Sequence, residues 1–215
     1  FENSLGCLIE PPTLGVPNVE TMLGTDPLPE EYVVPAWRDA FDSVFKPIPA
    51  VIRPRIMNQG PIDSCVGHAT AVQKSAQEKV IISPRDVFRI AKTLDGYGLE
   101  SYGTTLAAGQ DAVENGVAED GLVPRDPAMG RPAYVSQADV TDAVRTNREK
   151  HRGKSSYFVP RSVIQRSLFE MKVPVGTSSM WYAQDNAIGA SGLMTLPSTA
   201  MVAGHAFACI GWILR

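Results

Sequence analysis

Two short runs of this sequence contain the residues that could carry out nucleophilic chemistry. Cys65 ends the run at residues 58–65, which also contains Gln59, and His205 lies far downstream in a Gly-His-Ala run. A thiol becomes a nucleophile when a base removes its proton, and that base commonly comes from a distant part of the chain. These residues therefore predict acyl transfer, with Cys65 as the nucleophile and His205 as the group that takes and returns the proton.

The residues that follow Cys65 predict a helix with the thiol at its start. Residues 65–82 are rich in alanine and long side chains and contain no proline, which favours a helix. Asp63 and Ser64 are candidate caps for the first turn. At such a position the helix dipole lowers the pKa of a thiol, because it favours the thiolate.

The two runs resemble signatures of the papain-like (C1-type) cysteine peptidase family. Residues 58–65, Asn-Gln-Gly-Pro-Ile-Asp-Ser-Cys, are similar to the family's Asn-Gln-Gly-x-Cys-Gly-Ser-Cys motif, and residues 204–212 are similar to its Gly-His-Ala-Val-x-x-x-Gly-Tyr strand. The separation of Cys65 and His205 falls within the roughly 130–150 residues typical of the family. The resemblance implies an α+β papain-like fold, in which a helical half with Cys65 and an antiparallel β-barrel half with His205 enclose a cleft.

The resemblance also implies roles for three further residues. The side-chain amide of Gln59 and the backbone N–H of Cys65 would form the oxyanion hole. Gly103 lies in a stretch that resembles the bacterial branch of the family, where a glycine lines the cleft and exposed backbone pairs with an extended peptide. Trp181 could line the same cleft. A turn glycine and a core tryptophan are the structural alternatives for the last two residues.

The chain departs from the family pattern at several places near the site. Ile62 stands where the family has a cysteine, so the usual disulfide cannot form. Asp63 replaces a glycine, and its carboxylate would oppose ionisation of Cys65 unless it points away and caps the helix. No asparagine follows His205 to orient it before Arg215. Either the chain is a piece of a longer protein, or another group orients the imidazole.

The other two histidines have structural interpretations. His68 lies one helical turn after Cys65, in a slot where the family usually has an aromatic residue, and we expect it to pack in the core. His151 lies in a charged run, Arg-Glu-Lys-His-Arg, which predicts a solvated surface.

The rest of the chain predicts several further elements. Ser83, Pro84 and Asp86 indicate a helix start, and that helix should run to about residue 94. A third helix should begin at residue 104 or 105 and stop at Asn-Gly. Further helices are predicted near 137–150 and 160–171, strands at 173–177 and 201–214, and a break at Gly-Arg-Pro, residues 130–132.

Two regions are predicted along the chain. Residues 1–50 are rich in proline and should form an N-terminal arm, which is either a propeptide remnant, a contact arm for a partner or an ordinary strap. Residues 51–215 should form the papain-like peptidase domain, with an apparently truncated C-terminal end.

Composition excludes several classes of function. The net charge is −3 and no basic stripe is visible, which argues against nucleic acid as a partner. The longest apolar stretch is too short for a membrane span, and no pattern predicts a metal ion or another cofactor. Three cysteines without the usual disulfide framework favour a cytoplasmic or virion-associated protein, bacterial or viral, over a secreted one.

The most direct functional hypothesis is a peptidase that hydrolyses peptide or protein substrates through an acyl-enzyme. Two alternatives remain open. The chain could be a binding or structural module without turnover, held through its N-terminal arm in a larger assembly such as a phage particle. It could also be a domain that cuts its own polyprotein once.

Overall fold

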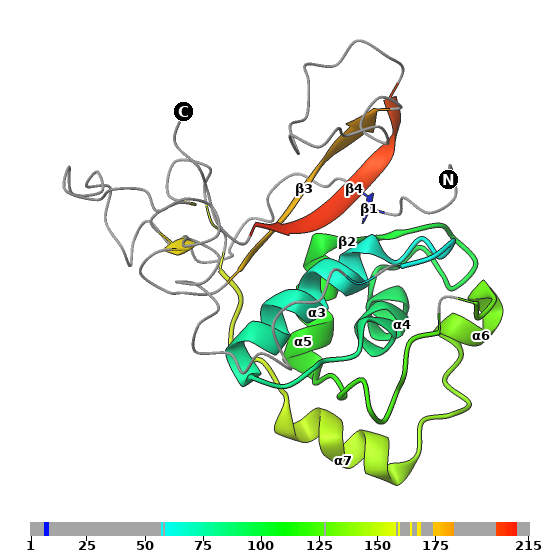
Figure 1. The fold of residues 1–215 in the computed structure, drawn as a ribbon. Coiled ribbons are helices and arrows are strands. Elements are labelled where there is room, and N and C mark those ends of the chain that lie inside the picture. The colour runs from blue at the N-terminus through cyan, green and yellow to red at the C-terminus, as the bar shows by residue number, and fades with distance from the viewer. Residues whose placement is uncertain are drawn as a thin grey trace.

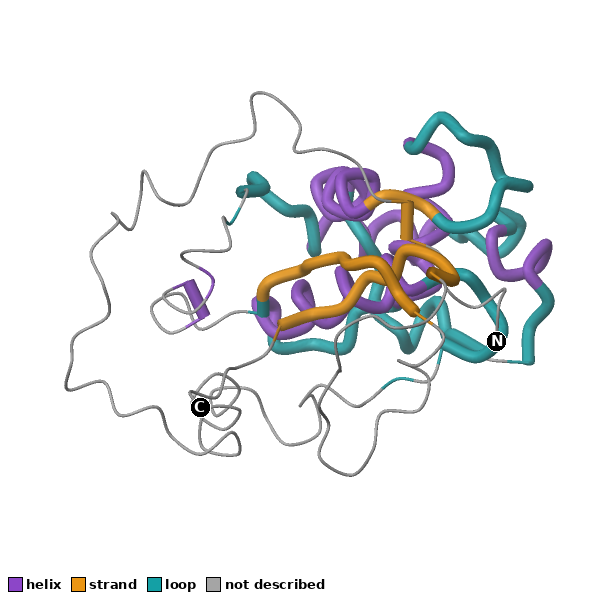
Figure 2. Tube along the Cα trace, turned by 90° about the horizontal axis from the view of Figure 1, so that it is seen from above, coloured by secondary structure: helices purple, strands orange, loops and turns teal. Residues whose placement is uncertain are grey.

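In the described residues a group of helices packs beside an antiparallel two-stranded sheet, and two very short strands form a second, parallel pair. The computed structural model describes residues 7–8, 57, 59–126, 128–157, 159, 164, 167–168, 174–182 and 201–209. Its helices are α3 (Cys65–Glu78), α4 (Pro84–Leu94), α5 (Leu106–Asn115), α6 (Arg131–Val135) and α7 (Asp142–Lys150), and its strands are β1 (Cys7–Leu8), β2 (Thr104–Thr105), β3 (Val175–Tyr182) and β4 (Met201–Cys209). Strands β3 and β4 lie on one side of α3, α4 and α5, and α7 lies on the other (Figure 1). Viewed from above, the two strands extend across these helices (Figure 2).

The starts and ends of α4 and α5 follow from their capping residues. The Ser83 hydroxyl accepts the backbone N–H of Asp86 at 3.0 Å, and the Thr105 hydroxyl accepts the N–H of Ala108 at 3.1 Å. Helix α5 ends at Gly116, whose φ of 97° is a conformation that glycine adopts without a steric penalty. The predicted boundaries of α4 and the predicted end of α5 are confirmed, whereas α5 begins at Leu106, after the predicted start, because Thr104–Thr105 form β2 and Thr105 is the cap.

Two glycines allow the three central helices to pack closely. A Cβ atom on Gly67 of α3 would lie 2.5 Å from the carbonyl oxygen of Pro84 in α4. A Cβ atom on Gly109 of α5 would lie 2.7 Å from a methyl carbon of Val66 in α3. Helix α3 therefore approaches both neighbours at a distance that only glycine permits, and this packing fixes the direction of the helix that begins at Cys65.

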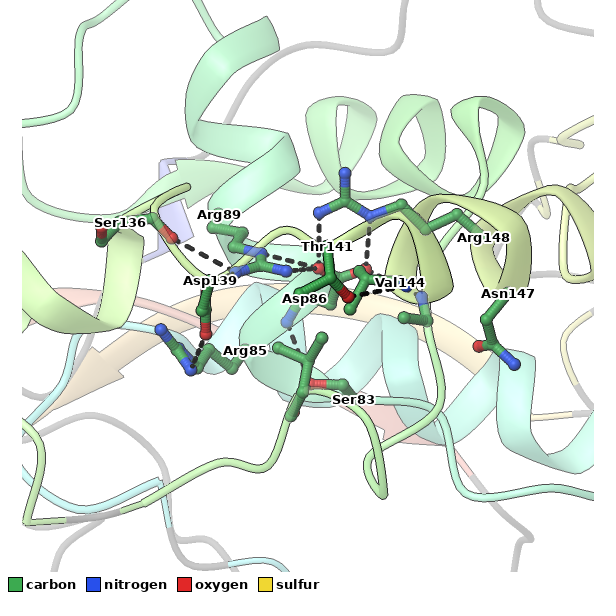
Figure 3. A network of polar contacts seen from close by, with 12 residues as sticks. Ser83, Arg85, Asp86, Arg89, Ser136, Asp139, Thr141, Val144, Asn147 and Arg148 are labelled. Atoms are coloured by element: carbon green, nitrogen blue, oxygen red, sulfur yellow. Dashed lines mark hydrogen bonds and ion pairs between the residues drawn. The ribbon is translucent and has the colours of Figure 1, made fainter.

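A buried carboxylate joins α4 to α7. Asp86 has no exposed surface and accepts from Arg89 Nε at 2.6 Å and from the Ala118 backbone N–H at 2.8 Å. The guanidinium of Arg148, on α7, donates to both Asp86 oxygens, at 2.7 and 3.0 Å. Figure 3 shows both arginines converging on this carboxylate. Because two guanidinium groups and a backbone donor surround Asp86, its charge is compensated in the interior.

Strands β3 and β4 form an antiparallel pair in which Ser179 lies opposite His205. The Gln73 side chain of α3 holds the start of β3: its Nε2 donates to the Pro174 carbonyl at 3.2 Å, and its Oε1 accepts from Gln110 Nε2 at 2.9 Å. The helices and the antiparallel pair confirm the predicted α+β class. Closure of a β-barrel stays a prediction, because within the described residues this half consists of β3 and β4.

Three details differ from the sequence-based expectations. Helix α6 begins at Arg131, inside the predicted break, because a proline is tolerated in the first turn of a helix. His151 is not on a solvated surface: it is 8% exposed, and its Nε2 lies 3.1 Å from Glu119 Oε1. The nucleophile helix stops at Glu78, where Lys79 takes a left-handed conformation. Most of the predicted arm at 1–50 and of the predicted helix at 160–171 lies outside the described residues.

Two kinds of feature are absent from the described residues. None of their helices is long and apolar enough to cross a membrane. Nor do their His, Cys, Asp and Glu side chains form a group that could hold a metal ion.

Candidate active site

Cys65 is the first residue of α3, as predicted, and it is 1% exposed. Ser64 is the N-cap residue, although its side chain makes no capping hydrogen bond. The backbone N–H of Ala206 in β4 donates to Cys65 Sγ at 3.5 Å. The positive end of the α3 dipole and this N–H both favour negative charge on the sulfur.

His205 directly precedes Ala206 in β4. The ring of His205 meets the ring of Trp181 edge-on, with 4.6 Å between the centroids. Burial lowers the pKa of His205 below its usual value, so the imidazole is neutral at neutral pH and able to accept a proton. Its Nδ1 atom is buried and has no hydrogen-bond partner among the described residues.

Apolar packing holds the two segments together. Cys65, Val66 and Ala69 of α3 form one buried cluster with Ala206 of β4, and Leu106 packs against it. The structure thus brings the start of α3 and the His205 segment of β4 together, and it places Trp181 against His205. This agrees with the arrangement expected of the pair, whereas their chemical roles stay predictions.

Gln59 lies in the loop before α3. Its Nε2 donates to the carbonyl oxygen of Ile62 at 2.9 Å, which fixes the orientation of the amide. A primary amide has two N–H donors, so the bond to Ile62 is compatible with a second donor for an oxyanion. The predicted oxyanion role of Gln59 stays a prediction.

Gly103 lies immediately before β2 and is buried with a φ of 68°. Its N–H donates to Asp63 Oδ2, and its carbonyl accepts from Lys92 Nζ at 2.9 Å. The neighbouring Thr104–Thr105 backbone is the part that meets an extended segment, because β2 pairs in parallel with β1, Cys7–Leu8. The predicted substrate-binding role of Gly103 stays a prediction.

Asp63 neither caps α3 nor carries an isolated charge beside the thiol. Its carboxylate is 1% exposed and accepts from Arg131 Nε at 2.9 Å as well as from the Gly103 N–H. The guanidinium compensates the carboxylate, which weakens the expected opposition to a thiolate at Cys65.

His68 packs inside the protein, as predicted. Its Nδ1 lies 3.0 Å from the Ser64 carbonyl oxygen, and burial lowers the pKa of His68 to about 4. The ring is therefore neutral at neutral pH, and Nδ1 carries the proton that is donated to Ser64. Its Nε2 is buried without a hydrogen-bond partner among the described residues.

Sequence reasoning missed three contacts of the site. They are the Ala206 N–H on the sulfur, the Asp63–Arg131 pair and the β1–β2 pairing. The first contact comes from the residue after His205 in β4, so it could be expected once β4 is known to cross α3. The other two join residues that are distant in the sequence, and no local pattern marks them.

Comparison with solved structures identifies the fold. The chain is similar to the cysteine protease xylellain from Xylella fastidiosa, with 15% identity, coverage of 98% of this chain and 80% of that chain, and a TM-score of 0.65. It is also similar to procathepsin B S9 from Trypanosoma congolense, with 20% identity, coverage of 98% and 72%, and a TM-score of 0.69. No protein-family profile and no curated protein matches the sequence.

The chain has an α+β papain-like fold. At these levels of identity the likeness establishes the fold alone. The chemistry must be inferred from this chain's own residues.

Proposed function

We propose that this protein is a cysteine peptidase that hydrolyses peptide bonds through an acyl-enzyme, and that Cys65 and His205 carry the reaction. The observation that supports this most is the 3.5 Å hydrogen bond from the Ala206 N–H to Cys65 Sγ. It connects a thiol at a helix N-terminus to the residue that follows the only histidine of β4. A reactive thiol needs both surroundings.

The proposed reaction uses groups of this chain alone. His205 takes the Cys65 proton, and the sulfur attacks the carbonyl carbon of the scissile peptide bond. The oxyanion that forms accepts from the Gln59 amide and the Cys65 N–H. His205 then gives its proton to the departing amine, which leaves a thioester. Water, deprotonated by His205, hydrolyses the thioester and restores the thiol.

The proposed substrates are peptides or proteins bound in an extended conformation. The β1–β2 pairing supports this, because the backbone of Thr104–Thr105 already accepts an extended segment of the chain itself. Strand β1 also contacts β4, the strand of His205. An extended peptide bound in the same way would lie near both catalytic segments.

A second candidate is a binding or structural module that keeps the fold without turnover in a larger assembly. The same β1 strand favours it, because the chain's own N-terminal segment occupies the β2 edge. Under the peptidase proposal, this segment is a removable cover like a propeptide.

The experiment is hydrolysis of a mixed fluorogenic peptide library by the whole chain and by a variant without residues 1–8. The peptidase proposal expects turnover that is abolished by Cys65→Ser in both forms. If neither form hydrolyses any peptide while both remain folded, the module without turnover is supported instead.

A further inference from the structure

Asp63 connects the start of α3 to residues 99–105, which we call the wall segment. Asp63 lies two residues before Cys65 and is 1% exposed. One carboxylate oxygen accepts the N–H of Gly103, and the other accepts from Arg131 Nε at 2.9 Å. The carboxylate therefore bonds directly to the wall segment at one oxygen and to a guanidinium at the other.

The guanidinium of Arg131 holds the same segment at three further points. It donates to the carbonyl oxygen of Leu99 at 2.8 Å and to that of Ser101. It also lies over the ring of Tyr102, 5.3 Å from the ring centroid. Arginine can make these contacts together because its donors are arranged in a rigid planar fork, which a lysine cannot reproduce.

A second cationic side chain, that of Lys92, binds the carbonyl group of Gly103. Lys92 Nζ donates to the Gly103 carbonyl at 2.9 Å and to the Ser101 hydroxyl at 2.7 Å, and its charge pairs with Asp95 at 2.7 Å. The N–H and the carbonyl of Gly103 are thus both bound by buried charged groups. Together they stabilise the left-handed conformation of Gly103 and set the position from which β2 begins.

We propose that Asp63 and Arg131 are positioning residues that hold the β2 edge at a fixed place relative to Cys65, and that they thereby govern binding of extended peptides. This inference rests on the proposed peptidase function. Neither residue contacts the reacting atoms. Their effect reaches a peptide through Thr104–Thr105, the backbone that already pairs with Cys7–Leu8.

The proposal has a specific consequence for two kinds of thiol reagent. A peptidyl epoxide needs the β2 edge in register with the sulfur, whereas iodoacetamide needs the sulfur alone. A misplacement of about 1 Å costs up to roughly 100-fold in a reaction between oriented groups. We therefore expect loss of the Asp63–Arg131 pair to affect the peptidyl reagent selectively.

The test compares Asp63→Asn and Arg131→Lys with the wild type, all as the full chain, so that β1 is present equally in each protein. Asp142→Asn is the matched control, because it removes one carboxylate charge from an exposed ion pair with Arg145. The second-order rate constants of Cys65 with the peptidyl epoxide and with iodoacetamide are measured by peptide mass spectrometry. Amide hydrogen exchange of residues 101–105 is measured on the same samples.

The expected result is a loss of about tenfold or more with the peptidyl epoxide, with the iodoacetamide rate within about threefold of wild type. Exchange of residues 101–105 should be faster in both variants, and the control should match the wild type throughout. Equal losses with both reagents would overturn the proposal, since the variants would then damage the thiol rather than the wall segment. Unchanged peptidyl labelling and unchanged exchange would overturn it as well.

Failure of the proposed function gives a different pattern. A wild type that reacts slowly with both reagents contradicts the peptidase proposal. The exchange measurement then decides the inference by itself: faster exchange of residues 101–105 in the variants supports the holding role, and unchanged exchange overturns it.

Discussion

The buried His68 should make the stability of this protein depend on pH. Its pKa is lowered from 6.5 to about 4 by burial, whereas the unfolded chain should titrate near 6.5. Between these two values the unfolded state binds more protons than the folded state, so stability falls as the pH falls through this window. At 1.36 kcal/mol for each pH unit, the difference amounts to about 3 kcal/mol.

The assay is urea unfolding at several pH values between 7.5 and 3.5, for the wild type and for His68→Phe. Phenylalanine keeps an aromatic ring in the 8%-exposed site and removes the titrating group. We expect the loss of unfolding free energy between pH 7.5 and 4 to be about 3 kcal/mol smaller in the variant, with no further difference below about pH 4.

Other groups also titrate in this range, including His205, whose pKa is lowered by burial. The comparison therefore uses the difference between the two proteins rather than the wild-type slope. The same pH dependence in both proteins, within about 1 kcal/mol, would refute the assignment of a neutral buried imidazole to His68.

Three further predictions concern packing, charge and the N-terminal segment. Asp86→Asn should lower the unfolding free energy by about 3–5 kcal/mol, because it removes the buried charge that pairs with both Arg89 and Arg148, whereas Asp142→Asn should change it by less than about 0.5 kcal/mol. Gly67→Ala should cost about 1–3 kcal/mol, because its Cβ would lie 2.5 Å from a carbonyl oxygen of α4, and Gly121→Ala, with nothing within 4 Å, is its control. Equal urea midpoints within either pair would contradict these assignments. Removal of residues 1–8 should speed labelling of Cys65 by a peptidyl epoxide, and an unchanged rate would show that β1 does not cover the site.

Local patterns predicted the helical half well, because its boundaries depend on neighbouring residues. Ser83 and Pro84 start α4, and Gly116 ends α5. Each signal acts within one turn of backbone, so a short run of sequence contains all the information needed. The same holds for the position of Cys65 at the first residue of α3.

Contacts between distant segments could not be predicted in this way. The charged run around His151 predicted exposure, yet His151 is buried beside Glu119. Asp63 was expected to cap α3 or to oppose the thiolate, whereas its partners come from the wall segment and from α6. A charged side chain can be buried wherever the fold supplies a partner of opposite charge, and the sequence does not state which partner that is.

The candidate site lies between these two cases. The types of Cys65 and His205 predicted a pair, and the structure brings their segments together. The Ala206 N–H was not predicted, because it is a backbone donor whose direction depends on how β4 crosses α3. The contact of Trp181 with His205 has the same origin, since it depends on the register of β3 against β4.

The central claim is that His205 activates Cys65, and labelling of the native protein with iodoacetamide at neutral pH tests it most directly. Intact and peptide mass spectrometry would follow Cys65, with Cys209, a free and partly buried thiol, as the internal reference. We expect rapid modification of Cys65 and a loss of about 100-fold or more in His205→Ala. Gln59→Ala should label like the wild type, because alkylation forms no oxyanion. Labelling of Cys65 no faster than an ordinary thiol, and unchanged in His205→Ala, would contradict the claim and leave a papain-like fold used for binding.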